Sequence, residues 1–282
     1  MNVRPSPIAG SWYPSQPEAL TWELNQYLDQ ARVKPPGGKV WGIVVPHAGY
    51  FYSGPVAAYA FKCLLGLQPE VVAVISPFHH GHSASLLTTA HTAYQTPLGL
   101  IEIDIQAVAE LDRRLCECLD EGLIPLSRDQ EHSLEIELPF LQHVLGRFCL
   151  LPVMIQDQRT PVAKALGQAL AVTLQGRPAL LVASSDLSHF YPHKIACRLD
   201  AELLRRLEAF DPLGVMEAES EGVGFACGRA AIAAVLWAAR QLGANRVSIL
   251  HHATSGDVSG EFGSVVGYGA AIIWQETELK GG

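Results

Sequence analysis

Short apolar runs rich in β-branched residues alternate along this chain with amphipathic stretches of helical period. Each run is long enough for a buried strand but too short for a buried helix. The predicted strands are Trp41–Val45, Val71–Ser76, Leu150–Ile155, Leu180–Ser184, Val247–Leu250 and Val265–Ile273. The predicted helices are Pro17–Ala31, Pro55–Leu65, Ile105–Leu119, Thr160–Thr173, Lys194–Ala209 and Arg229–Leu242, with a further one over Leu134–Leu145. This alternation predicts an α/β fold with a largely parallel central sheet and helices on both faces.

Length and composition fit one domain that spans residues 1–282. Apolar residues make up 49% of the chain and charged residues 17%, which is enough apolar surface for a continuous core. The net charge is −8, and lysine and arginine are spread singly, so the chain offers no basic stripe for nucleic acid. No span reaches the ~18 uninterrupted apolar residues that a membrane helix requires. We therefore expect neither a nucleic-acid nor a membrane partner.

Cysteine usage and the first residues of the chain favour a cytoplasmic location. The six cysteines form no CxxC pairs, and a chain of this size does not need disulfides for stability. The first residues contain no apolar run of the kind found in secretory signals. The sequence also lacks a Walker loop, GxGxxG, GxSxG and HExxH, so nucleotide binding, serine hydrolysis and zincin chemistry have no motif.

Histidines follow the ends of four predicted strands. His47 follows Trp41–Val45, His79 follows Val71–Ser76 and His189 follows Leu180–Ser184, while His251 and His252 follow Val247–Leu250. Because ligands bind beyond the carboxyl ends of strands in open α/β sheets, we expect these imidazoles to gather at one edge. Imidazole is the commonest metal ligand near neutral pH. The sequence therefore predicts a metal site among these histidines, with His47 and His79 as candidate ligands.

Cys227 is the candidate for a third ligand. It lies just before the predicted helix Arg229–Leu242, where the positive end of the helix dipole is expected to lower the pKa of the thiol and favour the thiolate. Each of these residues also has a simpler interpretation. A histidine after a strand can be hydrogen-bonded to the backbone alone, and a lone cysteine can be a small buried apolar residue.

Carboxylates accompany two further histidines. Asp186 and His189 lie three residues apart after a strand, and His132 follows Glu131 ahead of a predicted helix. A histidine beside a metal can act as a general base or proton donor, held in one tautomer by a carboxylate. We therefore take His189, Asp186 and His132 as candidate catalytic residues. Helix capping by the carboxylates is the alternative.

Six ordered motifs carry a family resemblance that runs from Ile8 to about Trp274. They are GSWYP at Gly10–Pro14, PHAGY at Pro46–Tyr50, HH at His79–His80, EHSLEIELPF at Glu131–Phe140, SSDLSH at Ser184–His189 and CGR at Cys227–Arg229. In this order they resemble the Memo family, and most closely its bacterial and archaeal branch called AmmeMemoRadiSam system protein B.

The resemblance implies a fold like that of the class III extradiol dioxygenases, the LigB-like group. It implies a metal pocket lined by the residues matching His47, His79 and Cys227, with Asp186 and His189 beside them. In the dioxygenases the position matching His189 is a catalytic base, but the third ligand is a carboxylate where this chain has Cys227. A thiolate softens the site and suits Cu(I), Zn(II) or redox-poised iron, so the ring-cleavage reaction does not simply carry over.

These observations predict a metal-dependent redox protein or oxidoreductase with a two-histidine, one-cysteine site. Iron is the first expected metal, with copper or zinc as alternatives, and the substrate is an unidentified small molecule or peptide. Two other functions stay open: a non-catalytic module that binds a peptide or protein, and a zinc-dependent hydrolase in which His189 moves a proton. The resemblance also implies a functional link to a radical SAM protein and an AMMECR-type protein.

Overall fold

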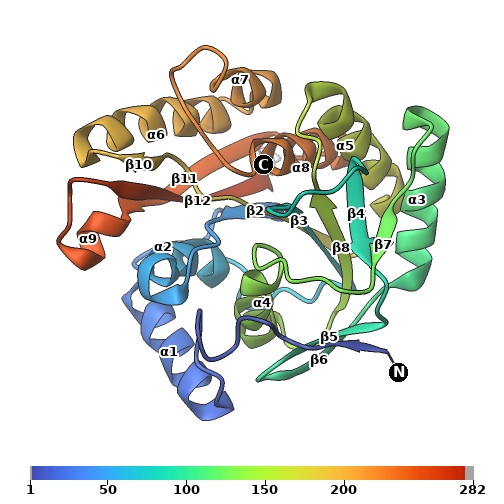
Figure 1. Ribbon diagram of the computed structural model, residues 1–282, viewed down its shortest axis with the longest axis horizontal. Helices are drawn as coiled ribbons and strands as arrows, with labels where there is room; N and C mark the ends of the chain where they lie inside the picture. The colour runs from blue at the N-terminus through green and yellow to red at the C-terminus, as the bar shows by residue number, and fades with distance from the viewer. Residues whose placement is uncertain (1, 277–282) are drawn as a thin grey trace, which may run out of the picture.

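A nine-stranded sheet forms the centre of the computed structural model, which describes residues 2–276. Its strand order is β10-β12-β2-β9-β3-β8-β4-β7, and β11 pairs with β12 (Figure 1). In that order the strands are β10 (His189–Tyr191), β12 (Val265–Gln275), β2 (Lys39–Val45), β9 (Ala179–Ser184), β3 (Val71–Pro77), β8 (Cys149–Ile155), β4 (Leu86–Thr89), β7 (Ile124–Leu126) and β11 (Arg246–Thr254). A smaller sheet contains β1 (Val3–Arg4), β5 (Ala93–Thr96) and β6 (Gly99–Glu102).

The four middle strands, β2, β9, β3 and β8, are parallel. Their apolar runs are buried on both faces, as expected for parallel strands that helices cover. In β3, Val71, Ala73 and Ile75 contribute to the core on one face, and Val72 and Val74 to the core on the other. The predicted parallel sheet is thus confirmed for its centre, while β12 and β4 pair antiparallel with its edges.

Helices cover both faces of the sheet, as predicted (Figure 1). One face carries α1 (Pro17–Gln30), α2 (Tyr50–Lys62) and α4 (Leu138–Leu145). The other carries α3 (Ile105–Leu119), α5 (Thr160–Leu174), α6 (His193–Glu208), α7 (Pro212–Glu217) and α8 (Arg229–Leu242). The short α9 (Ser255–Ser259) connects β11 to β12, and the 3-10 turn η1 (Glu135–Glu137) leads into α4. Among the described residues, none of these helices is long and apolar enough to cross a membrane.

Two predicted boundaries differ from the structure for identifiable reasons. Helix α2 begins at Tyr50 rather than Pro55, with Pro55 inside the helix. Proline cannot donate to the carbonyl of Phe51, but Phe51 is exposed, so water can take that place. The predicted helix over Leu134–Leu145 splits into η1 and α4, a common tightening of a helix start.

One strand end was wrongly predicted. His251 and His252 lie inside β11, which continues to Thr254, instead of following it. His251 stacks on Tyr59 with ring centroids 4.2 Å apart, and Nε2 of His252 lies 2.8 Å from Oδ2 of Asp200. Because side chains alternate along a strand, the two histidines point to opposite faces of the sheet. Neither joins the histidines at the carboxyl edge.

Candidate metal centre

Three side chains are placed at the carboxyl edge of the sheet by the same local geometry. His47, His79 and Asp186 each lie two residues after the end of a parallel strand, β2, β3 and β9 respectively. The register pairs Val45 with Ser184, and Ile75 with Ala183, so these strands end side by side. As predicted, residues that follow neighbouring strands gather at one edge of the sheet, and these three residues do so.

Hydrogen bonds fix the tautomer of His47, which is buried. Its Nδ1 lies 2.9 Å from Oγ of Ser184, and that hydroxyl donates to the carbonyl of Ser133 at 2.6 Å. Since the hydroxyl hydrogen is already used, Ser184 accepts a hydrogen bond from Nδ1–H of His47. Burial also holds the pKa of His47 well below its ordinary value, so the ring is neutral. Nε2 is therefore unprotonated and can accept either the thiol hydrogen of Cys227 or a metal.

His79 is oriented in the same way by a carboxylate. Its Nδ1 lies 2.9 Å from Oε1 of Glu131, and its backbone N–H donates to Oε2 at 2.5 Å. Burial acts to raise the pKa of Glu131, but hydrogen bonds from His79 and Ser133 outweigh it and hold that pKa well below its ordinary value. Because a carboxylate can only accept, Nδ1 of His79 carries the hydrogen and Nε2 is free.

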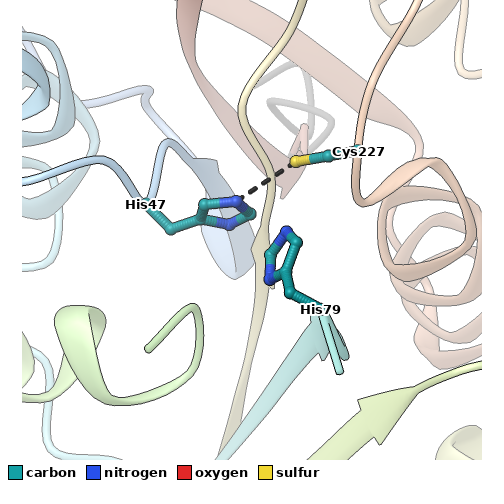
Figure 2. Close-up of side chains that lie close together, drawn as sticks. All are labelled: His47, His79 and Cys227. Atoms are coloured by element: carbon teal, nitrogen blue, oxygen red, sulfur yellow. Dashed lines mark hydrogen bonds between the residues drawn. The ribbon is translucent and has the colours of Figure 1, made fainter. Parts of the chain in front are cut away.

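Cys227 lies opposite the two histidines, as Figure 2 shows. Its Sγ is 3.1 Å from Nε2 of His47, and ligand atoms of His47, His79 and Cys227 all lie within 4.8 Å of one another. A metal at about 2.0–2.3 Å from nitrogen and sulfur donors places those donors about 3–4 Å apart. Two unprotonated nitrogens and one sulfur with this spacing fit a transition metal. The structure thus brings together the three residues that were predicted from the sequence to be ligands.

The predicted activation of Cys227 was wrong for the metal-free chain. The cysteine lies one residue before Gly228, the N-cap of α8, and its backbone N–H donates to the carbonyl of Asp186 at 3.2 Å. Burial raises the pKa of the thiol well above its ordinary value, and the nearby charge of Asp186 adds to this. The helix dipole is a smaller effect than desolvation here. A metal therefore has to displace the thiol proton.

Asp186 is the carboxylate nearest to His47. Its Oδ1 accepts the backbone N–H of His47 at 2.7 Å, and its Oδ2 lies 4.0 Å from Nε2 of that ring. Burial raises the pKa of Asp186 to about 7, although backbone hydrogen bonds from His47 and Ala48 oppose this. At neutral pH the group can take up or release a proton, which suits acid–base work beside a metal.

His189 reaches the same pocket from the start of β10. Its Nδ1 donates to the carbonyl of Leu187 at 2.7 Å, which leaves Nε2 as the acceptor. Burial lowers the pKa of His189, so the ring is neutral near pH 7. This is the arrangement of a general base held in one tautomer.

His132 lies against His79, one of the candidate ligands. The two rings stack with centroids 4.7 Å apart, and the ring of Trp12 lies 4.3 Å from that of His132. Burial lowers the pKa of His132 to about 4. Atoms of His79, Glu131 and His132 also lie close enough to hold a metal. Oε1 of Glu131, however, already accepts the backbone N–H groups of His132 and Ser133, so this group serves to orient His79.

A cavity of about 470 Å³ opens beside His47 and His79. Besides His47 and His79 it is lined by Asp186, His189, His132 and the aromatic side chains Trp12, Tyr52 and Phe190. Phe190 is 74% exposed and has a φ of 64°, a left-handed conformation that a phenylalanine rarely adopts. It lies where the β10–β12 register shifts between His189 and Tyr191. At this bulge the consecutive residues His189 and Phe190 both line the cavity.

Comparison with known proteins identifies the family. The profile described as Memo-like protein matches residues 4–272. The chain belongs to the Memo family. Relatives named MEMO1 family protein include that of Pyrobaculum arsenaticum, 34% identical over 97% of this chain and 99% of its own length. The relative of Methanopyrus kandleri is 35% identical over 94% of this chain and 97% of its own length. Family membership and its extent agree with the resemblance seen in the six motifs.

Among solved structures, an uncharacterized protein from Escherichia coli K12 is similar to this Memo-family chain. The two share 16% sequence identity and a TM-score of 0.46, and the match covers 83% of this chain and all of the other. The relation to the class III extradiol dioxygenases therefore stays a prediction from the sequence.

Sequence reasoning missed Ser184 as part of this Memo-family site. The residue ends β9 in the SSDLSH motif, and its role depends on a contact across 137 positions of the chain, which no local pattern predicts. The available signal for a role of Ser184 was the pair of adjacent serines, Ser184 and Ser185, at the end of an apolar run, because polar residues are unusual at a buried strand end.

Removing the hydroxyl of Ser184 is expected to weaken metal binding by about 10–100-fold, because the Nδ1–H of His47 then loses its acceptor and the ring its fixed orientation. Titration of metal-free Ser184→Ala with Zn²⁺ measures the change. Ser220→Ala, whose exposed hydroxyl donates to the carbonyl of Glu217, is the control and should bind as the unmodified chain does. Equal affinity in both variants would contradict the assignment of Ser184.

Proposed function

We propose that this Memo-family protein binds one metal ion through His47, His79 and Cys227 and acts as a metal-dependent oxidoreductase. The observation that carries the proposal is that both histidines have Nδ1 bonded away from the centre, which leaves Nε2 of each unprotonated, and that ligand atoms of His47, His79 and Cys227 lie within 4.8 Å of one another. Iron is the first expected metal, with copper and zinc as alternatives, because imidazole and thiolate accept all three.

A bound redox metal would supply electron transfer and Lewis acidity beside the cavity. The residues of the chain provide the rest of the proposed chemistry. Nε2 of His189 accepts a proton from a substrate group in the cavity, and Asp186 exchanges a proton near neutral pH. Trp12 and Tyr52 form part of the cavity wall and exclude water from one side of the substrate.

The exposed ring of Phe190 at the cavity favours a second candidate, a module that binds a peptide or protein without turnover. A zinc-dependent hydrolase is a third candidate, favoured by the free Nε2 of His189. The link to radical SAM and AMMECR-type proteins rests on the family resemblance. The cytoplasmic location stays a prediction, with which the six free cysteines are compatible.

Metal analysis after anaerobic purification and loading with Fe²⁺ tests the proposal. We expect about one metal ion per unmodified chain and little or none in His47→Ala and Cys227→Ala, because each variant removes one of three ligands. Cys116→Ala removes an exposed cysteine far from the site in sequence and is the control. Equal metal content in all four proteins would contradict the metal site. A second measurement, the consumption of oxygen or of an added reductant by the metal-loaded unmodified chain, separates the oxidoreductase from the other two candidates.

A further inference from the structure

Arg4 is buried although it lies in the two-residue strand β1 near the start of the chain. Its guanidinium makes three separate contacts with one segment: Nε donates to Oδ2 of Asp129 at 2.6 Å, Nη2 donates to the carbonyl of Glu131 at 2.7 Å, and Nη1 pairs with Glu135. The guanidinium also lies over the ring of Tyr94, 4.7 Å from its centroid. The N-terminal strand is thus tied to residues 129–135 through one side chain.

Asp129 completes a closed loop of hydrogen bonds around Glu131. Oδ2 of Asp129 accepts from Arg4, and its Oδ1 accepts the backbone N–H of Glu131 at 2.8 Å. The carbonyl of Glu131 accepts from Arg4, so both backbone polar groups of this residue are held by the Arg4–Asp129 pair. Its backbone therefore has little freedom to rotate.

The carboxylate of Glu131 in turn holds His79 through two hydrogen bonds, one to the ring Nδ1 and one to the backbone N–H. Few contacts separate Arg4 from His79. The guanidinium holds the backbone of Glu131, and the carboxylate of Glu131 holds the imidazole of His79. A shift of Glu131 would turn the ring of His79 and move its Nε2 away from His47 and Cys227.

We propose that Arg4 is a positioning residue of the metal centre, which holds Glu131 in the orientation that directs Nε2 of His79 toward Cys227. The inference rests on the proposed metal-binding function. Only a planar guanidinium offers donors in three directions at fixed angles, so lysine cannot replace it at this position. The N-terminal strand is thereby a part of the metal site, although it contributes no ligand.

A double-mutant cycle on metal affinity tests the proposal. Zn²⁺ is titrated into the metal-free chain, Arg4→Lys, Glu131→Gln and the double variant, at a temperature where thermal unfolding curves show all four folded. We expect each single change to lower the metal affinity about 10–100-fold. The double variant should bind no less tightly than the single variant with the lower affinity, because both changes break the same series of contacts from Arg4 through Glu131 to His79. If the two residues acted independently, the fold-losses of affinity in the two single variants would multiply in the double variant.

Arg177→Lys is the matched control, since Arg177 pairs with Asp104 in a partly buried ion pair outside the site. It should leave the affinity unchanged. If Arg4→Lys does not fold, Asp129→Asn, which weakens the contact with Arg4 but keeps the side-chain shape, takes its place in the cycle. Unchanged affinity in the Arg4 or Asp129 variant, or multiplied effects in the double variant, would overturn the positioning role. Failure of the unmodified chain to bind Zn²⁺, Fe²⁺ or Cu⁺ would instead overturn the proposed function itself.

Discussion

Metal affinity is expected to rise about ten-fold for each pH unit between about pH 7 and about pH 8, because one thiol proton leaves for each metal bound. Burial holds the pKa of Cys227 above its ordinary value, so in the metal-free chain the thiol is protonated throughout this range. Protons compete with the metal for the sulfur, and affinity therefore falls as the pH falls. His47 adds no competing proton, because burial lowers its pKa.

Below about pH 7 the dependence should become steeper. Burial raises the pKa of Asp186 to about 7, and its Oδ2 lies 4.0 Å from Nε2 of His47, so a nearby cation favours the ionised carboxylate. Metal binding then displaces a second proton. Isothermal titration calorimetry with Zn²⁺ in buffers of different ionisation enthalpy counts the protons released. Asp186→Asn should remove the steeper part, and an affinity that does not change with pH would contradict the assignment of a protonated Cys227.

Gly228→Ala is expected to destabilise the fold by about 1–3 kcal/mol and to abolish tight metal binding, because the added methyl group overpacks the start of α8. A Cβ at this position would lie 2.4 Å from the carbonyl oxygen of Ser184 and 2.8 Å from Cβ of Ser185. Both neighbours belong to the chain at the end of β9, which cannot move without moving Asp186. Relief of the clash has to displace Cys227, the adjacent residue.

Gly263→Ala is the control for this change, since a Cβ there meets nothing within 4 Å. Urea unfolding measures the loss of stability, and titration with Zn²⁺ measures the affinity of the folded variant. The close approach of α8 to β9 would not be needed for the site if Gly228→Ala bound metal as tightly as Gly263→Ala does.

The meeting of His47 and His79 could be predicted from the sequence because it follows from the fold, whereas Cys227 follows no strand. Parallel strands with apolar runs end at one edge, so residues two positions beyond each end had to meet. The same reasoning failed for His251 and His252. Whether a strand ends at Leu250 or continues to Thr254 depends on its pairing with β12, and the sequence there does not alternate regularly between apolar and polar residues, so it did not show the length of the strand.

Other parts of the site depend on contacts between distant segments and could not be predicted from the local sequence pattern. Arg4 belongs to a strand of two residues, too short for a periodic pattern, and its partners lie more than a hundred positions away. The pKa of Cys227 was mispredicted because the position before a helix was visible in the sequence, whereas its burial beside Asp186 was not. The family resemblance supplied the choice of these ligands among eleven histidines and six cysteines.

The optical spectrum of the Co²⁺-loaded chain tests the central claim most directly. Co²⁺ takes the ligands that Zn²⁺ and Fe²⁺ take, and a thiolate bound to it absorbs in the near ultraviolet. We predict this absorption in the unmodified chain and in Cys197→Ser, and its loss in Cys227→Ser, which keeps the size of the side chain but not the sulfur. Retention of the full thiolate absorption in Cys227→Ser would contradict a metal centre built from His47, His79 and Cys227.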